Sequence, residues 1–218
     1  LRILASQILT AQEEERKRIA LEVHDVLGSS LSAIKFKVEE VLYHVPEGQT
    51  LGLFKPLEVL IPLIQDTIGE VRRIQSDLRP PVLDDLGIIA TISWFCRRFE
   101  TIYSNIGVHQ TITAREENVP GHLKISLFRI IQEAMNNIGK HAQADRIDLG
   151  LQKLGGTLEL SIGDNGKGFD PEALSSRESS QKGLGLSSMK ERVEFSGGTL
   201  TIESATGKGT LLKAVWSI

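Results

Sequence analysis

The sequence of 218 residues contains one cysteine, seven prolines and no long uninterrupted apolar run. Cys96 cannot form an internal disulfide, and its apolar neighbours Trp94 and Phe95 predict a small buried side chain in a reducing compartment, with a reactive thiol as the less favoured alternative. The apolar runs are far shorter than the roughly 20 residues that span a bilayer, and no basic-then-apolar leader opens the chain. We therefore expect a cytoplasmic chain without a membrane segment, and its start at Leu1 predicts a piece of a longer protein.

Positive charge is not in excess either, because 25 Lys and Arg stand against 28 Asp and Glu, a formal net charge of −3. Proteins that bind nucleic acid by displacing counterions from phosphates need a basic surface, so direct nucleic-acid binding is not expected. The sequence is 40% apolar and 24% charged, which is typical of a globular chain and excludes disorder throughout.

Two apolar-periodic stretches predict a helical hairpin over residues 1–77. From residue 1 to about residue 45, apolar side chains recur at three- or four-residue steps, and a second such stretch ends at Pro80-Pro81. Turn-forming residues at 46–49 separate the two stretches. Because the partner helix cannot cover the whole apolar stripe, we expect two copies to form a dimeric four-helix bundle.

After a linker over residues 78–86, the pattern predicts an α+β two-layer sandwich over residues 87–218. The expected elements are a helix, a strand, a helix, a β-hairpin, a helix and a final hairpin, at residues 87–105, 108–113, 120–141, 146–152 with 157–162, 184–195, and 199–203 with 210–216. The Ser-rich stretch 170–182 has too little apolar content to pack and predicts a mobile loop.

Glu133, Asn137 and Lys140 lie four and three residues apart on one predicted helix, so they share a face. Asn137 can offer an amide oxygen to Mg²⁺, Lys140 a positive charge to a phosphate, and Glu133 a carboxylate to a metal-bound water. The face is thus a candidate site for a metal-phosphate group, although an ordinary surface pair of opposite charges explains this segment equally well.

Asp164 follows a predicted strand, where its carboxylate can accept the exocyclic amine of adenine and where Gly166 and Gly168 allow the backbone to approach the ring. Thr210 opens the last strand and can hold a water or the adenine. A third segment presents backbone N–H groups to an anion where a loop meets a helix, and consists of Gly183, Leu184, Gly185 and Leu186. Taken singly, these segments are weak signals, and a turn explains Asp164-Asn165-Gly166 and the start of the last strand better.

The order of the segments is more specific than any one of them. Asn137, then Asp164, then Gly183-x-Gly185, then Gly209-Thr210 resembles the boxes of the GHKL ATP-binding fold, which gyrase-type ATPases, a heat-shock chaperone and histidine kinases share. The resemblance covers roughly residues 87–218. It implies an ATP site with Asp164 at the adenine, Asn137 at Mg²⁺ and the turn 183–186 at the phosphates.

His24 is followed by Asp25 on the first predicted helix. At about 100° per residue His24 lies on the flank of the apolar stripe, within reach of solvent, and Asp25 points away from the core. An imidazole beside a carboxylate can be oriented and deprotonated to attack phosphorus. A single histidine on a helix is more simply a surface residue, and we interpret the other four in that way: His44, His109, His122 and His141.

Residues 14–35 resemble the phosphoacceptor box of sensor histidine kinases of the nitrate-sensor class, and residues 79–87 resemble the exit from the second helix of that class. The resemblance implies that His24 accepts a phosphoryl group from ATP with Asp25 as its base, and that an aspartate of a response-regulator receiver domain then takes it. It also implies a homodimer that forms the cytoplasmic portion of a longer sensor. In this family a glutamine often follows the acid by four residues and supports dephosphorylation of the regulator. Ser29 stands there instead, which predicts poor phosphatase activity.

Two other functions remain open from the sequence. The first alternative is a GHKL ATPase or an anti-sigma-type serine kinase whose hairpin only dimerises. The second is an ATP-sensing dimeric scaffold that catalyses no reaction. The joint presence of Glu133, Asn137 and Asp164 argues against the scaffold, and replacement of His24 by glutamine separates the kinase from the ATPase.

Overall fold

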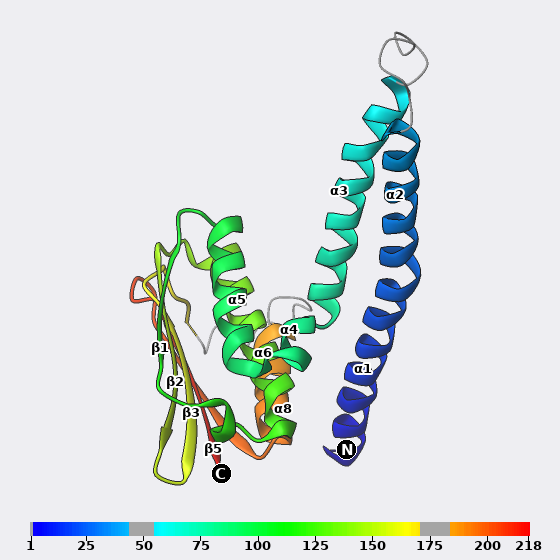
Figure 1. Cartoon of the computed structure of the whole chain (residues 1–218). Coiled ribbons are helices and arrows are strands. Elements are labelled where there is room, and N and C mark those ends of the chain that lie inside the picture. Colours follow the sequence, from blue (N-terminus) through cyan, green and yellow to red (C-terminus); the bar gives the residue numbers. More distant parts are fainter. Residues whose placement is uncertain (1, 44–54, 171–183) are drawn as a thin grey trace. The chain divides into compact units, whose positions relative to one another are not determined.

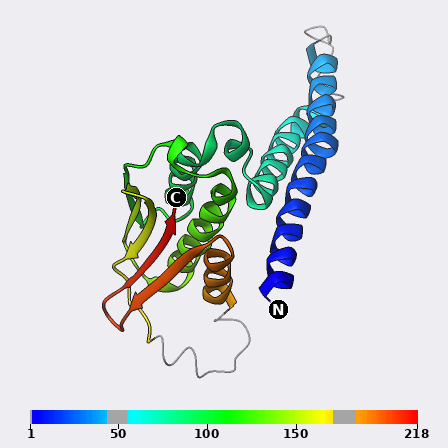
Figure 2. The same ribbon diagram turned by 90° about the horizontal axis from the view of Figure 1, so that it is seen from below.

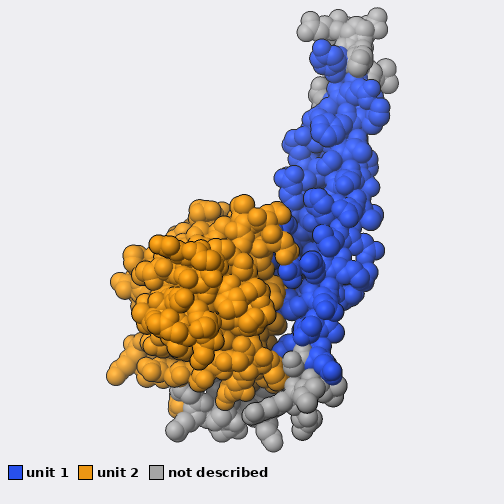
Figure 3. All heavy atoms as spheres, turned by 60° about the horizontal axis from the view of Figure 1, so that its bottom comes forward, with its two compact units in different colours: residues 1, 3–81 blue, residues 2, 82–218 orange. Residues whose placement is uncertain are grey.

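The computed structural model describes residues 2–43, 55–170 and 184–218. The chain forms two compact units, Ile3–Pro81 and Val82–Ile218, which Figure 3 colours separately. The turn expected at 46–49 lies outside the described residues, as does the Ser-rich loop beyond Asp170.

The first unit is a helical hairpin (Figure 1). Its first arm is continuously helical and consists of α1 (Arg2–Glu22), the π-helical segment η1 (Val23–Gly28) and α2 (Ser29–Tyr43). Its second arm is α3 (Lys55–Leu78). The two predicted helices are confirmed, but the periodicity did not predict η1, because six residues of π-helix barely disturb the spacing of apolar side chains.

The two arms pack through small and aliphatic side chains. Ala20 of the first arm and Ile64 and Val71 of α3 are buried. Gln75 is buried as well, and its Nε2 donates a hydrogen bond of 3.2 Å to the carbonyl oxygen of Ala20. These buried residues lie along one side of each arm, and that side of each arm packs against the other arm.

The stretch 78–86, which we assigned to a linker, is partly helical. Pro81 begins α4 (Pro81–Asp85), at a helix position where the missing N–H has no cost. Leu83 of α4 is buried in the hydrophobic core of the second unit. This part of the stretch is therefore packed structure in the second unit.

The N-terminus of helix α5 (Gly87–Ile102) is hydrogen-bonded to the carboxylate of Glu116, which lies in a segment distant in sequence. Glu116 accepts hydrogen bonds from the backbone N–H groups of Ile88 and Ile89, at 3.0 Å each, and contacts Lys124 Nζ at 2.6 Å. Partial burial by itself would raise the pKa of Glu116, but the hydrogen bonds from Lys124 and the two N–H groups outweigh it and lower the pKa. Glu116, which belongs to the short 3₁₀ turn η2 (Glu116–Asn118), thus caps α5 as an anion.

The second unit contains a five-stranded sheet in the order β1-β2-β3-β5-β4. Its strands are β1 (Gly107–Ile112), β2 (Arg146–Leu154), β3 (Thr157–Asp164), β4 (Gly198–Ser204) and β5 (Thr210–Ser217). β1 and β2 are parallel, and the other neighbours are antiparallel. The register of β3 and β5 places Asp164 opposite Thr210.

Three helices cover one face of this sheet (Figures 1 and 2): α5, α6 (Gly121–Asn137) and α8 (Leu184–Phe195). Alternate residues of the strands, such as Leu158, Leu160 and Ile162 of β3, are buried against the helices. The predicted two-layer sandwich is therefore confirmed. The second π-helical segment, η3 (Ile138–Ala142), continues α6 and was not predicted.

Cys96 lies in this core and is fully buried, as expected. Burial, assisted by the charge of Glu100, raises the pKa of its thiol to about 12, so the thiol is not reactive at neutral pH. Among the described residues, no helix combines the length and the apolar character that a membrane crossing requires.

Candidate functional site

His24 and Asp25 both lie in η1, within the first arm of the hairpin. The backbone N–H of Ser29 donates to the carbonyl of His24, five residues earlier, which is the hydrogen bond that defines a π-helix. Our estimate of 100° per residue therefore does not apply to this segment. Segments of this kind are frequent at functional sites.

The side chains of His24 and Asp25 are both exposed. They are adjacent in the chain, and neighbouring residues on a helix point in different directions. Accordingly, in the described part of the hairpin the two side chains form no hydrogen bond with each other. His24 is accessible to a reactant, and pairing with Asp25 would require a side-chain rotation.

At the end of β3, Asp164 is half-buried. Its Oδ1 accepts a hydrogen bond of 2.8 Å from the Gly166 N–H. Burial raises the pKa of the Asp164 carboxyl, although hydrogen bonds from Gly166 and from the backbone and hydroxyl of Thr210 act in the opposite direction. By the alternation along β3, the carboxylate lies on the helix-covered side of the sheet. Asp164 is thus an anion with lone pairs still available in a partly dry environment, which suits it to accept a donor group.

Gly166 and Gly168 lie against other parts of the chain. A side chain at Gly166 would collide with the carbonyl of Ala142, to which the Lys167 N–H donates at 2.8 Å. Gly168 has a φ of +57° and lies against the carbonyl of Ala205. These contacts pack the loop after β3 onto η3 and onto the turn before β5. That the two glycines also let a nucleotide ring approach the backbone stays a prediction.

Glu133 and Asn137 project from the last turns of α6, where Asn137 Nδ2 donates to Glu133 Oε1 at 3.3 Å. Gly185, in the first turn of α8, approaches them so closely that a side chain there would run into the Glu133 carboxylate. This contact joins the predicted metal-ligating residues to the predicted phosphate-binding turn. Asn137 Oδ1, the atom that a hard cation prefers, is not used in the bond to Glu133.

Among the described residues, no side-chain hydrogen bond or ion pair joins Glu133 or Asn137 to the two other predicted site residues of this region, Lys140 and Leu186. Lys140 is exposed in η3, beyond the end of α6. Leu186 packs against the hydrophobic core, so its side chain supports α8 instead of facing a ligand. Gly183 and the side chain of Leu184 lie outside the described residues.

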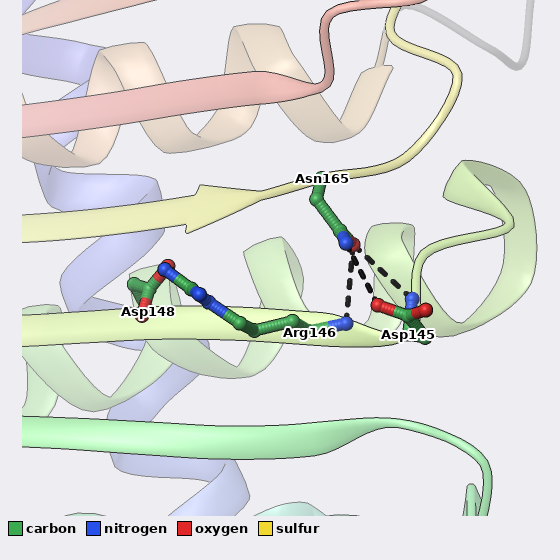
Figure 4. Close-up of polar contacts among 4 residues, drawn as sticks. All are labelled: Asp145, Arg146, Asp148 and Asn165. Atoms are coloured by element: carbon green, nitrogen blue, oxygen red, sulfur yellow. Dashed lines mark hydrogen bonds and ion pairs between the residues drawn. The ribbon is translucent and has the colours of Figure 1, made fainter.

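Asn165 follows Asp164 in a motif that we treated as a turn, and it has a structural task that the sequence did not reveal. Figure 4 shows its Oδ1 accepting hydrogen bonds from the N–H groups of Asp145 and Arg146, at 3.2 and 3.1 Å, while its Nδ2 donates to Asp145 Oδ1 at 2.7 Å. These bonds tie the loop after β3 to the start of β2. They hold in place the backbone on which Asp164 stands.

A depression of about 590 Å³ is lined by Arg146 and Asp148 of β2 and also by Asp164. Arg146 and Asp148 alternate with buried residues and so lie on the outer face of the sheet. They form an ion pair of 2.8 Å with each other (Figure 4). Thr210 also lines this depression, so it borders two residues of the predicted nucleotide site, although the alternation along β3 assigns the Asp164 carboxylate to the helix-covered face.

Among residues 2–43, 55–170 and 184–218, no group of three or more His, Cys, Asp or Glu side chains is arranged to hold a metal ion. Glu133 and Asn137 would offer two oxygen atoms to a metal ion. This number suits Mg²⁺, which commonly takes one or two protein ligands and completes its octahedron with water and phosphate oxygens.

Comparisons with known proteins match both parts of the chain to families. Residues 122–216 match the family model of the histidine kinase-, DNA gyrase B- and HSP90-like ATPases. Residues 15–83 match a second family model, described as histidine kinase. The second unit is therefore a GHKL-type ATPase domain, and the hairpin is the histidine kinase domain that precedes it. The chain belongs to the sensor histidine kinases of the nitrate-sensor-like class.

Two curated relatives extend the match along the chain. The signal transduction histidine-protein kinase/phosphatase DegS of Brevibacillus brevis is 36% identical over 94% of this chain and 52% of its own length. The sensor histidine kinase MctS of Rhizobium johnstonii is 33% identical over 99% of this chain and 46% of its own length. The chain thus spans about half the length of the curated relatives it matches.

A solved structure has the same fold. It is the histidine kinase domain of the Erythrobacter litoralis EL346 blue-light activated histidine kinase, with a TM-score of 0.54, 16% sequence identity, and coverage of 87% of this chain and 94% of that chain. At this identity the likeness supports the fold alone.

Proposed function

We propose that this chain is the catalytic core of a two-component sensor kinase, in which ATP phosphorylates His24 and an aspartate of a response-regulator receiver domain then accepts the phosphoryl group. The observation that carries the proposal is the combination, in one chain, of an exposed histidine on a helical hairpin with a GHKL domain. In that domain, Asp164 and the group of Glu133, Asn137 and Gly185 occupy the ends of adjoining elements.

Each residue of the second unit has a role that suits its surroundings. Asp164 accepts the exocyclic amine of adenine, supported by Gly166 and Thr210. Asn137 and Glu133 would hold Mg²⁺, which would supply charge stabilisation for the transferring phosphoryl group. Lys140 offers a charge to a phosphate from the flexible end of its side chain. The backbone N–H groups at the start of α8 face the same anion.

In the hairpin, the imidazole of His24 is the nucleophile. Asp25 acts as its base after rotating toward the ring, since a carboxylate that orients an imidazole also stabilises the charge that develops on it. Phosphate transfer depends mostly on positioning and charge stabilisation, so the protein needs few additional reacting groups.

We further propose that the chain forms a homodimer through the hairpin. On the first arm, Leu27, Ile34 and Val41 are spaced by seven residues and remain 48%, 51% and 47% exposed. An apolar groove of about 390 Å³ runs along this row and includes Ile34 and Val41. Such a heptad row is the contact surface of a helical bundle.

α3 has two pairs of apolar residues whose spacing is a multiple of seven. Ile64 and Val71 are seven residues apart and buried against the first arm. Leu60 and Ile74 are fourteen residues apart, at another position of the heptad, and remain exposed. Each arm therefore has a second apolar row left over after the hairpin has formed. A second copy of the chain, adding two identical arms, would bury these rows in a four-helix bundle.

We infer a cytoplasmic location as well, because the buried free thiol of Cys96 suits a reducing compartment. The full chain would then be positioned to meet a receiver domain.

Labelling with γ-phosphate-labelled ATP tests the enzymatic proposal. Wild-type protein is expected to acquire a label that acid removes, as phosphohistidine does, and His24→Gln is expected to acquire none. His109→Gln is the matched control, because His109 is exposed on β1 and has no proposed role. Asn137→Ala should remain folded and lose Mg²⁺-dependent labelling.

The same assay separates the alternatives. An acid-stable label would indicate serine phosphorylation, and ATP consumption that persists at the wild-type rate in His24→Gln would indicate a GHKL ATPase. Absence of ATP binding in wild-type protein would contradict all three nucleotide-dependent functions.

A further inference from the structure

The hairpin contains a polar contact at the point where its first arm changes from α-helix to π-helix. Of its described side chains, only Glu13 and Gln75 are both polar and buried. Gln75 is 6% exposed and donates across the hairpin to the carbonyl oxygen of Ala20 at 3.2 Å. A buried amide lowers stability unless it is hydrogen-bonded, so this single contact decides whether the side chain can be accommodated.

The acceptor is significant because of its position. In a regular α-helix, the carbonyl of Ala20 accepts a hydrogen bond from the N–H of His24, four residues later. From Val23 onward the pattern changes, and the N–H of Ser29 donates to the carbonyl of His24, five residues earlier. Gln75 therefore supplies a donor to the backbone in the turn that leads into the π-helical segment.

This arrangement links a side chain of α3 to the orientation of His24. A π-helical segment is less regular than an α-helix, and it persists only where neighbouring structure supports it. The donor from Gln75 reaches the carbonyl of Ala20, whose partner in a regular α-helix, the N–H of His24, belongs to the segment that changes register. The side chain of His24 projects from that segment and is itself exposed, so the backbone of the segment largely sets the direction of the imidazole.

We propose that Gln75 is a positioning residue for His24: by hydrogen-bonding to the carbonyl of Ala20, it stabilises the π-helical segment Val23–Gly28 and so sets the direction in which the imidazole meets the phosphoryl donor. The inference rests on the proposed function, because it assigns His24 as the phosphoacceptor. Gln75 touches neither the nucleotide nor the reacting atoms.

The test uses the full chain with Gln75→Met, which has a similar length and lacks the donor. Gln65→Met is the matched control, since Gln65 is an exposed glutamine on the same helix. We expect Gln75→Met to lower the kcat of His24 phosphorylation on the order of ten- to a hundredfold, the effect of a reacting group displaced by about 1 Å. The KM for ATP should not change, because Gln75 is not part of the nucleotide site.

Two further measurements distinguish positioning from general damage. Backbone amides of residues 24–29 should exchange hydrogen faster in Gln75→Met than in wild type, with no change in α3. The unfolding temperature should fall only slightly, because the Ala20 carbonyl loses one hydrogen bond while an apolar side chain replaces a buried amide. Gln75→Leu, with a different shape, should change kcat and exchange in the same direction, which keeps the test valid if one variant folds poorly.

Wild-type kcat and wild-type exchange in Gln75→Met would overturn the inference, and so would an equal loss of kcat in Gln65→Met. Failure of the proposed function is recognised separately. If wild-type protein formed no phosphohistidine, the kinase assignment would fail, whereas the exchange comparison would still report whether Gln75 supports the segment.

Discussion

Replacing Asp164 with asparagine should separate nucleotide affinity from folding stability. Asparagine keeps a carbonyl oxygen that can accept the 2.8 Å hydrogen bond from Gly166, and it removes the negative charge. Burial raises the pKa of the Asp164 carboxyl in spite of the hydrogen bonds from Gly166 and Thr210, so the charged form is held at a cost. The variant avoids that cost and should be at least as stable as wild type at neutral pH.

The loss of affinity should be much larger than any change in stability. A hydrogen bond to a charged group is worth about 1.5–3 kcal/mol, so its loss should raise the dissociation constant for ATP roughly ten- to hundredfold. Asp164→Ala provides the contrast, because it removes the acceptor of the Gly166 N–H entirely. That variant should lose about 1–3 kcal/mol of stability in addition to its affinity.

The pH dependence has a definite sign. Because the folded-state pKa of Asp164 lies above the unfolded value of about 3.9, its relative contribution to stability is greatest below that value and is lost as pH rises through the folded-state pKa. The advantage of Asp164→Asn should therefore be absent at low pH and appear as pH rises from about 4 toward neutrality.

The assays are isothermal titration with Mg-ATP and thermal unfolding at several pH values. Asp148→Asn is the control, since Asp148 lies on the outer face of the sheet and pairs with Arg146. Unchanged affinity in Asp164→Asn, or an equal loss in Asp148→Asn, would refute the assignment of Asp164 to the adenine.

Three further changes test other parts of the chain. Ser29→Gln should speed the decay of a phosphorylated receiver domain and leave labelling of His24 unchanged, because a glutamine amide is long enough to position a water. Strong phosphatase activity of the wild-type protein would contradict the role assigned to Ser29, and the DegS relative, described as a kinase/phosphatase, makes that activity worth measuring. Leu27→Lys should convert dimers to monomers in light scattering, at a cost of several kcal/mol, unless wild type is itself monomeric. Glu116→Gln should lower the free energy of unfolding by about 1–2 kcal/mol at pH 7. Because the pKa of Glu116 is lowered, its contribution to stability is complete above a pH of about 4.3 and disappears as the pH falls further. Equal acid sensitivity of wild type and Glu116→Gln would therefore argue against the capping role of Glu116.

The sequence alone predicted the long helices, the strands and their order along the chain, because those depend on local periodicity; it did not predict α4, η1 or η3. Apolar residues at three- and four-residue steps produce a helix that can bury one face, and alternation produces a strand that can bury one side. The hairpin at Gly155-Gly156 and the final hairpin followed from the same patterns. The order of Asn137, Asp164, Gly183-x-Gly185 and Gly209-Thr210 along the chain resembled the GHKL boxes closely enough to indicate the type of ATPase domain, which the family match supports.

The features that the sequence did not reveal depend on contacts between distant residues. The π-helical segment around His24 is accompanied by a hydrogen bond from Gln75 to Ala20, 55 positions apart. Glu116 caps α5 by accepting a hydrogen bond from the N–H of Ile88, 28 residues before it. Such contacts require side-chain positions in three dimensions, which no local pattern contains.

The loop glycines show the same division at the nucleotide site. Their presence after a strand indicated a tight turn, and Gly166 does form one with Asp164. Only the folded chain shows that Gly166 lies against Ala142, and that Gly185 lies against the Glu133 carboxylate. The sequence by itself determined which elements form and in what order. The tertiary structure decided which residues meet, because the packing of one element against another selects close approaches that are invisible along the chain.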